Sequence, residues 1–375
     1  VAIGVLALTV VTSVINGFEG ELVRVITGMN GDVILYSRGE TISDAAKIEA
    51  KIREVVPETR RVTASFVTEI MTSGPNGVAG AVVEGVDPST LGEVTVIPER
   101  VTEGKLPEGD DEVALGSSLA ERLGAKVGTE IRLIAPFVGE PPEGETSSPP
   151  KSLVVRVTGI VRMGLHDYDS KFVFAQLGAV QRFLESPGRV TSFKIRLAPG
   201  ADPRGAADRL AESFGYPFRA KDWGQLNKNL FYAIKLEKAV IAIILTVIVI
   251  VAAFNVVSTL MMVIHDKTKE LSILKAMGLR RAQSFRLFCL IGGVIGSAGT
   301  AIGVTLGLAV NWLLGKTHWI ELPPEIYYIG YLPVVVNWTE IAAIAGIAVL
   351  ITFAAALYPA VKVALRSPLE GIRYE

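Results

Sequence analysis

A run of 26 residues without a charged side chain, from 239 to 264, limits how this chain can fold more than any other feature. About 20 consecutive apolar residues are enough for a helix to cross the hydrocarbon core of a bilayer. Residues 287–315 and 341–361 are also uncharged and long enough to cross. The second half of the chain therefore predicts three membrane-spanning helices.

The first 18 residues form another uncharged run, which we interpret as a first span whose beginning precedes Val1. A cleaved signal peptide is the alternative interpretation. Such a peptide has a basic flank, an apolar region of about 7 to 15 residues and a small-residue cleavage site. The run departs from that pattern, so we predict four spans in total.

Basic residues in short loops indicate the orientation of the spans, because Lys and Arg are enriched on the cytoplasmic side. Residues 265–286 carry six basic side chains against two acidic ones, and three more basic side chains follow residue 361. The connection at 316–340 is acidic and rich in aromatic residues, which favours the outer side. With four spans, residues 19–238 then also lie outside.

The segment from 19 to 238 has the composition of a water-soluble domain, although half of the whole chain is hydrophobic. Its sequence alternates β-rich runs with helical ones. Apolar residues at helical spacing predict a helix over 43–56, and two β-rich runs joined by residues 74–77 predict a hairpin. This segment is therefore predicted to be an α+β domain of two subdomains.

The predicted fold class is an α-helical membrane protein with four transmembrane helices and a large α+β extracytoplasmic domain inserted between the first and second helices. The expected boundaries are 1–26 for the first span and its extension, 27–222 for the outer domain, 223–264 for a connecting helix and the second span, 265–286 for a cytoplasmic helix and loop, 287–315 for the third span, 316–340 for an outer loop, and 341–375 for the fourth span and a cytoplasmic tail.

Signatures of catalysis are weak. The tripeptide at 315–317 lacks the glycine that a phosphate-binding loop needs five residues earlier, because that position is Val310. The three histidines are divided between the two sides of the membrane, and the lone Cys289 excludes a multi-cysteine metal site within the chain. The segment LHDYD at 165–169 could be a lone metal or catalytic site, but a solvated turn is the simpler interpretation. We expect no enzyme activity, no bound metal and no bound cofactor.

The net charge of −1 gives no overall basic field that would attract nucleic acid, so we expect no nucleic-acid partner. Membrane lipid is instead an expected contact of the apolar runs.

Glycines recur every three or four positions on the third predicted span. Small residues at this spacing let transmembrane helices approach one another closely. The glycines concerned are Gly292, Gly296, Gly299, Gly303 and Gly307.

The segment 135–150 is dense in proline and glutamate and lies between two predicted strands. Proline cannot donate a ladder hydrogen bond, so we expect an exposed hairpin tip rather than a regular pair of strands. A connector without a function is one interpretation. The other is a protruding loop that captures a partner by strand addition or by inserting Phe137.

The charged stretch 265–278 has a helical pattern of its own. Ile264, Leu271, Leu274 and Met277 recur at three- and four-residue steps, and Gly278 is suited to end a helix. One interpretation is an amphipathic helix that lies on anionic lipid. The other is a helix that docks into a groove of a cytoplasmic ATPase and passes its movement to the adjoining spans.

The stretch DKTKELSILKAMGLRRAQ at 266–283 resembles the coupling helix that follows the second span in FtsX-like and MacB-like permeases. NGFEGELVRVITGMNGDVIL at 16–35 and WGQLNKNLFYAIKLEKAVIAIILTVIVIVAAFNVVSTL at 223–260 resemble the LolC/LolE-type permeases of the lipoprotein-releasing complex, within the type VII ABC superfamily. The resemblance runs over nearly the whole chain in the same order.

This resemblance implies a permease subunit in the bacterial inner membrane that extracts outer-membrane-destined lipoproteins and passes them to a periplasmic carrier. The implied partners are a cytoplasmic LolD-like ATPase dimer, which binds the ATP and Mg, a second LolC/LolE-like permease, a LolA-like carrier and the triacylated lipoproteins themselves. Whether the chain is LolC-like, LolE-like or serves both roles stays open.

Three sets of candidate site residues follow from the resemblance and the patterns above. The expected ATPase-docking residues are Lys269, Glu270, Leu271, Leu274, Lys275, Met277 and Gly278. The expected carrier-binding residues are Pro136, Phe137, Val138, Gly139, Glu140, Pro141 and Pro142. The expected lipoprotein-contact residues are Val14, Phe18, Leu22, Phe254, Val257 and Met261, unless these only face lipid or the protein core.

Other functions are compatible with the same parts. A MacB-like permease that exports drugs or peptides would also use an ATPase, but its cargo would lack acyl chains. An FtsX-like scaffold would signal to a periplasmic hydrolase. A membrane-anchored enzyme is disfavoured by the weak signatures of catalysis.

Overall fold

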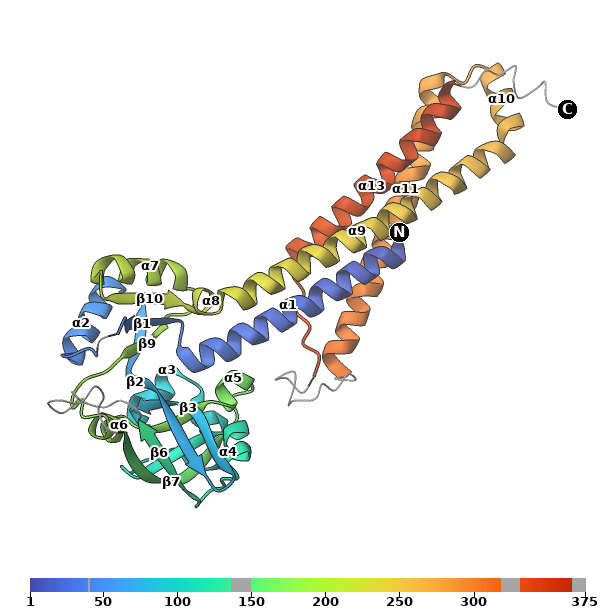
Figure 1. Cartoon of the computed structure of the whole chain (residues 1–375). Helices are drawn as coiled ribbons and strands as arrows, with labels where there is room; N and C mark the ends of the chain where they lie inside the picture. The colour runs from blue at the N-terminus through green and yellow to red at the C-terminus, as the bar shows by residue number, and fades with distance from the viewer. Residues whose placement is uncertain (40, 136–149, 318–330, 366–375) are drawn as a thin grey trace. The chain divides into compact units, whose positions relative to one another are not determined.

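The computed structural model describes residues 1–39, 41–135, 150–317 and 331–365 (Figure 1). These residues form two compact units. Unit 1 contains the described residues of 1–21, 232–322 and 329–375, and unit 2 contains those of 22–231.

Unit 1 is built from long apolar helices. Four helices are long and apolar enough to cross a membrane: α1 (Ala2–Asn30), α9 (Lys228–Asp266), α11 (Arg281–Thr317) and α13 (Trp338–Leu365). A helix satisfies its backbone hydrogen bonds within itself, which is the requirement for a chain that crosses lipid. The four predicted spans are thus confirmed by length and composition. A short helix, α10 (Thr268–Ala276), connects α9 to α11.

The glycines of α11 mark its closest approaches to other helices. A Cβ on Gly292 would lie 2.2 Å from the Cβ of Ala356 on α13, and a Cβ on Gly307 would lie 2.9 Å from the Cβ of Thr9 on α1. The glycine spacing of α11 therefore permits close packing against two helices. The first part of the glycine face packs on α13, and the later part packs on α1.

Replacing Gly292 with Ala is expected to lower the free energy of unfolding by about 1 to 3 kcal/mol, because the added methyl group overlaps Ala356. The thermal denaturation midpoint of the detergent-purified chain measures this change. The matched control is Gly346→Ala on α13, where an added Cβ would meet no atom within 4 Å. Equal midpoints for the two variants would contradict the packing argument.

One part of unit 2 is a split βαβ arrangement. Its elements are β1 (Val33–Ser37), α2 (Ala45–Val55), β2 (Thr59–Gly74), β9 (Ser192–Leu197), α7 (Pro203–Phe214) and β10 (Phe218–Asp222). The antiparallel strand order is β10-β1-β9-β2, and α2 and α7 cover one face around a core that includes Leu35, Ile52, Phe193 and Leu210. The helix predicted over 43–56 is confirmed as α2.

The other part of unit 2 lies in the sequence between β2 and β9. It contains β3 (Gly77–Val86), β4 (Val101–Gly104), β5 (Glu112–Gly116), β6 (Glu130–Ala135), β7 (Lys151–Val161) and β8 (Phe172–Gln176). The pairings β2-β3-β8-β5-β7-β6 return to β2, so the strands close a barrel, and β4 adds to β7. The predicted hairpin is confirmed as β2 and β3.

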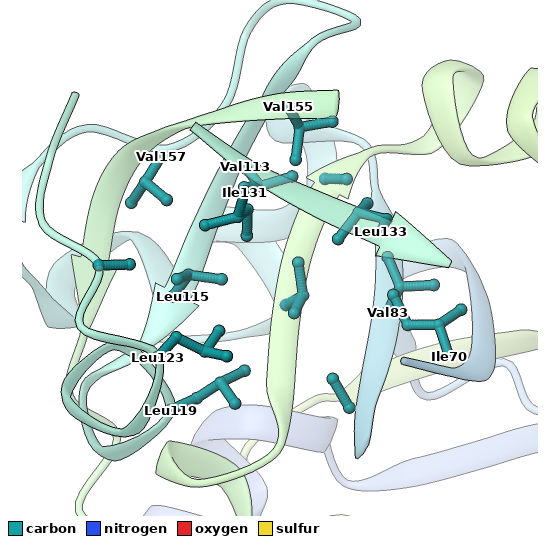
Figure 2. Close-up of a cluster of buried hydrophobic side chains, with 14 of the residues drawn as sticks. Ile70, Val83, Val113, Leu115, Leu119, Leu123, Ile131, Leu133, Val155 and Val157 are labelled. Carbon is teal, nitrogen blue, oxygen red and sulfur yellow. The ribbon is translucent and has the colours of Figure 1, made fainter. Parts of the chain in front are cut away.

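The barrel is filled by side chains that alternate inward along each strand. Figure 2 shows Ile70, Val83, Val113, Leu115, Ile131 and Val155 converging with Leu119 and Leu123 of α4 (Ser117–Leu123). Short helices cover the rest of this part: α3 (Pro88–Val94), η1 (Ile97–Arg100), α5 (His166–Asp169) and α6 (Leu177–Phe183). After β10, α8 (Trp223–Leu226) leads into α9.

Candidate functional site

The inner face of α10 is fixed to its own unit. Leu271 packs against a buried cluster that includes Ile264 and Phe288. The ammonium of Lys275 donates a hydrogen bond of 2.6 Å to the carbonyl oxygen of Val363, in the last turn of α13. A cation is favoured there because the last carbonyls of a helix carry partial negative charge.

The outer face of α10 carries apolar side chains that nothing in the described residues covers. Ile273 and Leu274 are about half exposed, and Met277 is 80% exposed. The helix ends in a Schellman motif, in which the N–H of Leu279 donates to Leu274 and that of Gly278 donates to Lys275. Gly278 has a φ of +109°, which only glycine adopts readily.

The apolar stripe expected over 264–277 is divided in the structure. Ile264 and Leu271 face the bundle, whereas Leu274 and Met277 face outward together with Ile273. The reason is that α9 ends at Asp266 and α10 begins afresh at Thr268, which changes the phase between the two. Leu271 and Lys275 therefore hold α10 in place, and Ile273 is a surface residue that the sequence pattern missed. Lys269 and Glu270 lie on the exposed surface beside it.

The six candidate lipoprotein-contact residues do not gather at one place. Helices α1 and α9 are antiparallel, because Gly4 contacts Val249 while Glu19 pairs with Lys238. Phe254 lies 16 residues beyond Lys238 on α9, or about 24 Å along the helix axis. Val14 and Phe18, half-buried on α1, are therefore near one end of α9, and Phe254 is near the other.

The remaining candidates separate in the same way. Val257 and Met261 follow Phe254 along α9, and Met261 packs against the cluster around Ile264. Leu22 belongs to unit 2. Contact of these residues with a lipoprotein stays a prediction.

The candidate carrier-binding residues, 136–142, lie outside the described residues. The structure describes the two strands that precede and follow them, β6 and β7, which pair in register from Glu130 with Arg156 to Ala135 with Lys151. The segment thus begins and ends at one end of a strand pair.

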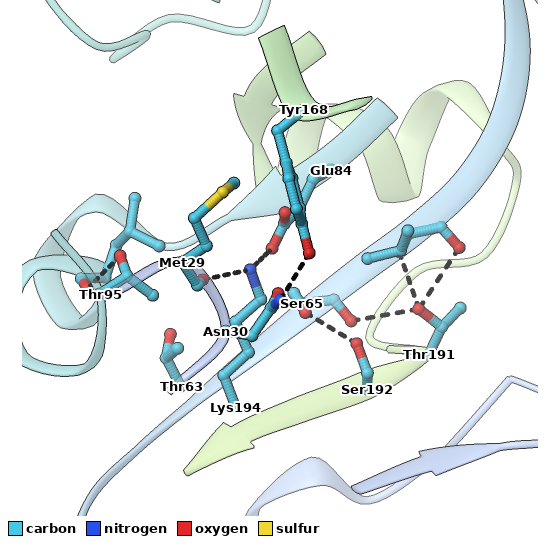
Figure 3. Close-up of polar contacts among 12 residues, drawn as sticks. Met29, Asn30, Thr63, Ser65, Glu84, Thr95, Tyr168, Thr191, Ser192 and Lys194 are labelled. Carbon is cyan, nitrogen blue, oxygen red and sulfur yellow. Dashed lines mark hydrogen bonds and ion pairs between the residues drawn. The ribbon is translucent and has the colours of Figure 1, made fainter. Parts of the chain in front are cut away.

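A buried polar junction lies in unit 2, where the end of α1 meets both parts of the domain (Figure 3). Lys194 of β9 and Glu84 of β3 form an ion pair of 2.5 Å, with side chains only 4% and 2% exposed. The same ammonium donates to the carbonyl oxygen of Met29 at 3.1 Å, and Asn30 donates to the Tyr168 hydroxyl at 2.6 Å. One charged pair therefore connects the split βαβ part, the barrel and α1.

The sequence position of Lys194 explains its orientation. Along β9, Phe193, Ile195 and Leu197 face the core under α2 and α7, so Lys194 and Arg196 point to the opposite face. That face meets the C-terminal end of α1.

Arg196 caps the same helix end. Its guanidinium donates to the carbonyl oxygen of Thr27 at 3.0 Å, to that of Val94, and to the Asp32 carboxylate at 3.2 Å. The last carbonyls of a helix have no partner within it. Two cations on alternate positions of β9 thus satisfy carbonyls in the last turn of α1 and complement its dipole.

The LHDYD segment forms α5, in which His166 and Asp167 are exposed to solvent. Asp169 is buried and accepts hydrogen bonds from the N–H groups of Met163 at 2.7 Å and Gly164 at 3.0 Å. Burial raises the pKa of Asp169, and these two donors only partly offset that effect. Burial likewise raises the pKa of Tyr168, whose ring is tilted against that of Phe172 with the two centroids 4.8 Å apart. The segment serves to hold the junction.

Sequence reasoning missed the junction. The available signal was a pair of opposite charges, Glu84 and Lys194, each flanked by apolar residues in a β-rich run. Ionised side chains at such positions are rarely buried without a partner.

These elements define a class of protein: a multi-pass membrane protein whose α+β domain is inserted between its first two spans and whose short helix α10 exposes an apolar face. Residues 1–213 match the model of the MacB-like periplasmic core domain, and residues 242–368 match that of the FtsX-like permease C-terminal domain. The chain belongs to the family with the MacB-like periplasmic core domain, and unit 2 is its periplasmic domain.

Curated relatives extend over the whole chain. The lipoprotein-releasing system transmembrane protein LolC of Neisseria meningitidis is 29% identical, covering 100% of this chain and 92% of the relative. The protein named LolE of Haemophilus influenzae is 25% identical, covering 99% and 91%. Among solved structures, the periplasmic region of MacB from Actinobacillus actinomycetemcomitans matches with a TM-score of 0.37 and 14% identity, covering 55% of this chain and 94% of that one.

Proposed function

We propose that this chain is a permease subunit of an ATP-driven complex that extracts lipoproteins from the inner membrane and passes them to a periplasmic carrier. The observation that carries the proposal is the similarity to LolC and LolE proteins from end to end, through the spans and the periplasmic domain alike.

The energetics of extraction support a need for an external motor. Each methylene group of an acyl chain contributes about 0.8 kcal/mol to membrane affinity. Removing a triacylated anchor therefore costs the summed contribution of tens of methylene groups. In this proposal the chain binds no nucleotide. ATP and Mg are held by a partner ATPase dimer, and a second permease completes the membrane part.

The exposed face of α10 is the proposed contact with that ATPase. Ile273, Leu274 and Met277 offer apolar surface, and Lys269 and Glu270 offer charges beside it. Because Leu271 and Lys275 attach α10 to α9 and α13, a push on α10 moves those helices with it.

The test is ATP-driven release of a purified triacylated lipoprotein from proteoliposomes that contain the complete complex. Release that requires both ATP and a soluble carrier supports the proposal. ATP hydrolysis without release, together with co-purification of only a drug-efflux adaptor or a wall hydrolase, would contradict it.

The segment 135–150 is proposed to bind the carrier. Deleting residues 137–142 is expected to reduce carrier capture by the complex at least tenfold, while ATP hydrolysis stays within twofold of the unaltered complex. Pull-down of the complex with immobilised carrier measures this. Undiminished capture after the deletion would remove the segment from the carrier site.

A further inference from the structure

A short irregular segment of unit 1, residues 332–337, packs against α1 and leads into α13 (Figure 1). We call this segment the strap. The N–H of Val335 donates a hydrogen bond of 2.9 Å to the carbonyl oxygen of Ser13 on α1. A Cβ on Gly17 would overlap the carbonyl group of Pro333, which is backbone and cannot turn aside as a side chain can. The strap therefore rests directly on α1, at a position that has no side chain.

The strap reaches beyond the outer end of the uncharged run of α1 toward the membrane interior. Ser13 precedes Glu19, the first charge after that run, by six residues, or roughly 9 Å along the helix axis. Irregular backbone at membrane depth needs partners from the protein, because lipid offers no hydrogen bonds. Pro333 has no N–H, and the N–H of Val335 is satisfied by Ser13. The sequence LPVVV at 332–336 is thus suited to this depth.

The strap joins α13 through a capped helix end. The side chain of Asn337 accepts a hydrogen bond of 3.1 Å from the N–H of Thr339, and its carbonyl oxygen accepts one of 3.1 Å from the N–H of Ile341. Only Val336 separates this cap from Val335, which is bonded to α1. The connection between α1 and the start of α13 is therefore short.

Two side-chain contacts hold α1 to the neighbouring helices at the same level. The Asn16 amide donates to the Glu340 carboxylate on α13 at 2.6 Å. The Asn311 amide of α11 is buried and donates to the Ser13 hydroxyl at 2.8 Å and to the carbonyl oxygen of Thr9 at 3.4 Å. Hydrogen bonds depend on angle as well as distance, so these contacts define the rotation and the height of α1 against α11 and α13.

The other end of α13 is attached to α10, where Lys275 donates to the carbonyl oxygen of Val363. Helix α13 is thus held at one end to the proposed ATPase contact and at the other end to α1. Closely packed protein transmits displacement from one element to the next. A displacement of α10 therefore has a connected route to α1 through α13 and the strap.

We propose that the strap fastens α1 to α13, so that α1, α11 and α13 move as one body during the ATPase cycle. This inference rests on the proposed function and adds to it the connection by which movement at α10 reaches α1. Without the strap, ATP is still hydrolysed but release of lipoprotein is lost.

The first experiment displaces the strap in the complete complex. In Gly17→Ala the added methyl group takes the position of the Pro333 carbonyl. ATP-driven release of lipoprotein from proteoliposomes is expected to fall at least fivefold, while ATP hydrolysis stays within twofold of the unaltered complex. The matched control is Gly20→Ala on the same helix, where an added Cβ would meet no atom within 4 Å, and its release is expected to stay within twofold.

The two substitutions raise the helix propensity of α1 equally, so a difference between them isolates the contact with the strap. Equal release from Gly17→Ala and Gly20→Ala would overturn the inference.

The second experiment substitutes a covalent connection for the strap. Asn16→Cys with Glu340→Cys places two thiols where these side chains now meet, and Cys289→Ser removes the chain's lone cysteine. In a complex whose other subunits lack cysteine, linking the thiols with a short bis-maleimide is expected to leave release within twofold, because α1 and α13 do not separate. With Gly17→Ala added, the same link is expected to raise release at least threefold over the unlinked complex.

A link that abolishes release when Gly17 is intact would show that α1 and α13 must separate, and would refute the inference even if Gly17→Ala fails to assemble. A link that restores nothing to an assembled Gly17→Ala complex would refute it as well. Failure of the unaltered complex to release lipoprotein would instead refute the proposed function, so the two failures are distinguishable.

Discussion

Replacing Leu274 or Met277 with Glu is expected to reduce ATP-driven release of lipoprotein at least tenfold while the chain still inserts and folds. Both side chains are on the exposed face of α10, which is the proposed ATPase contact, and a charge buried at that contact would lack a partner. Neither side chain supports the bundle, which Leu271 and Lys275 hold. Release from proteoliposomes and co-purification of the ATPase are the two measurements, and both should fall together.

The matched control for α10 is Gln283→Glu. It adds the same charge a few residues later in an exposed position, and its side chain can still accept the hydrogen bond from the N–H of Arg280. Release is expected to stay within twofold in this variant. If Leu274→Glu and Met277→Glu behave like the control, α10 does not dock through this face.

Replacing Lys194 with Met is expected to destabilise unit 2 by about 3 to 5 kcal/mol, because Glu84 is then a buried charge without its partner and the Met29 carbonyl loses its donor. Limited proteolysis of the full chain at increasing denaturant concentration measures the change, through the rate of cleavage within residues 22–231. Native unit 2 should be cleaved slowly and the variant rapidly.

The double variant Lys194→Met with Glu84→Leu separates the charge from the packing. Replacing both members of a buried pair by apolar residues of similar volume is often neutral, so most of the lost stability should return. Arg209→Met, which breaks the exposed pair with Glu58, should change stability by less than about 1 kcal/mol. A Lys194→Met variant as stable as Arg209→Met would show that the buried ion pair does not contribute to the stability of unit 2.

Local patterns predicted the elements well. The four spans are evident from uninterrupted apolar runs, and α2 and the β2–β3 hairpin from spacing and turn residues within a few positions of one another. The glycine face of α11 was also evident, although its division between α13 and α1 needed the packing. Each of these properties is determined by residues close together in the chain.

Properties that depend on distant residues could not be predicted. Glu84 and Lys194 are 110 positions apart, and only the strand order brings them together. The levels of α1 and α9 along one another depend on contacts such as Gly4 with Val249, so hydrophobicity alone could not show that Val14 and Phe254 lie near opposite ends of the pairing. The exposure of Ile273 depends on where α9 ends and α10 begins.

The strand pairings show two nested insertions: the periplasmic domain is inserted between the first two spans, and the barrel is inserted in the split βαβ part. Val33 at the start of β1 is opposite Asp222 at the end of β10, so the chain enters and leaves the domain at neighbouring points. Ser65 and Ser192 are opposite each other in the same way, and the described residues between them form the barrel with its helices. A segment whose ends are adjacent can be inserted or exchanged without moving the elements around it. An exchange of the barrel would therefore leave the chain path of the split βαβ part intact, but the new segment would have to supply a partner for Lys194, which loses Glu84 with the barrel.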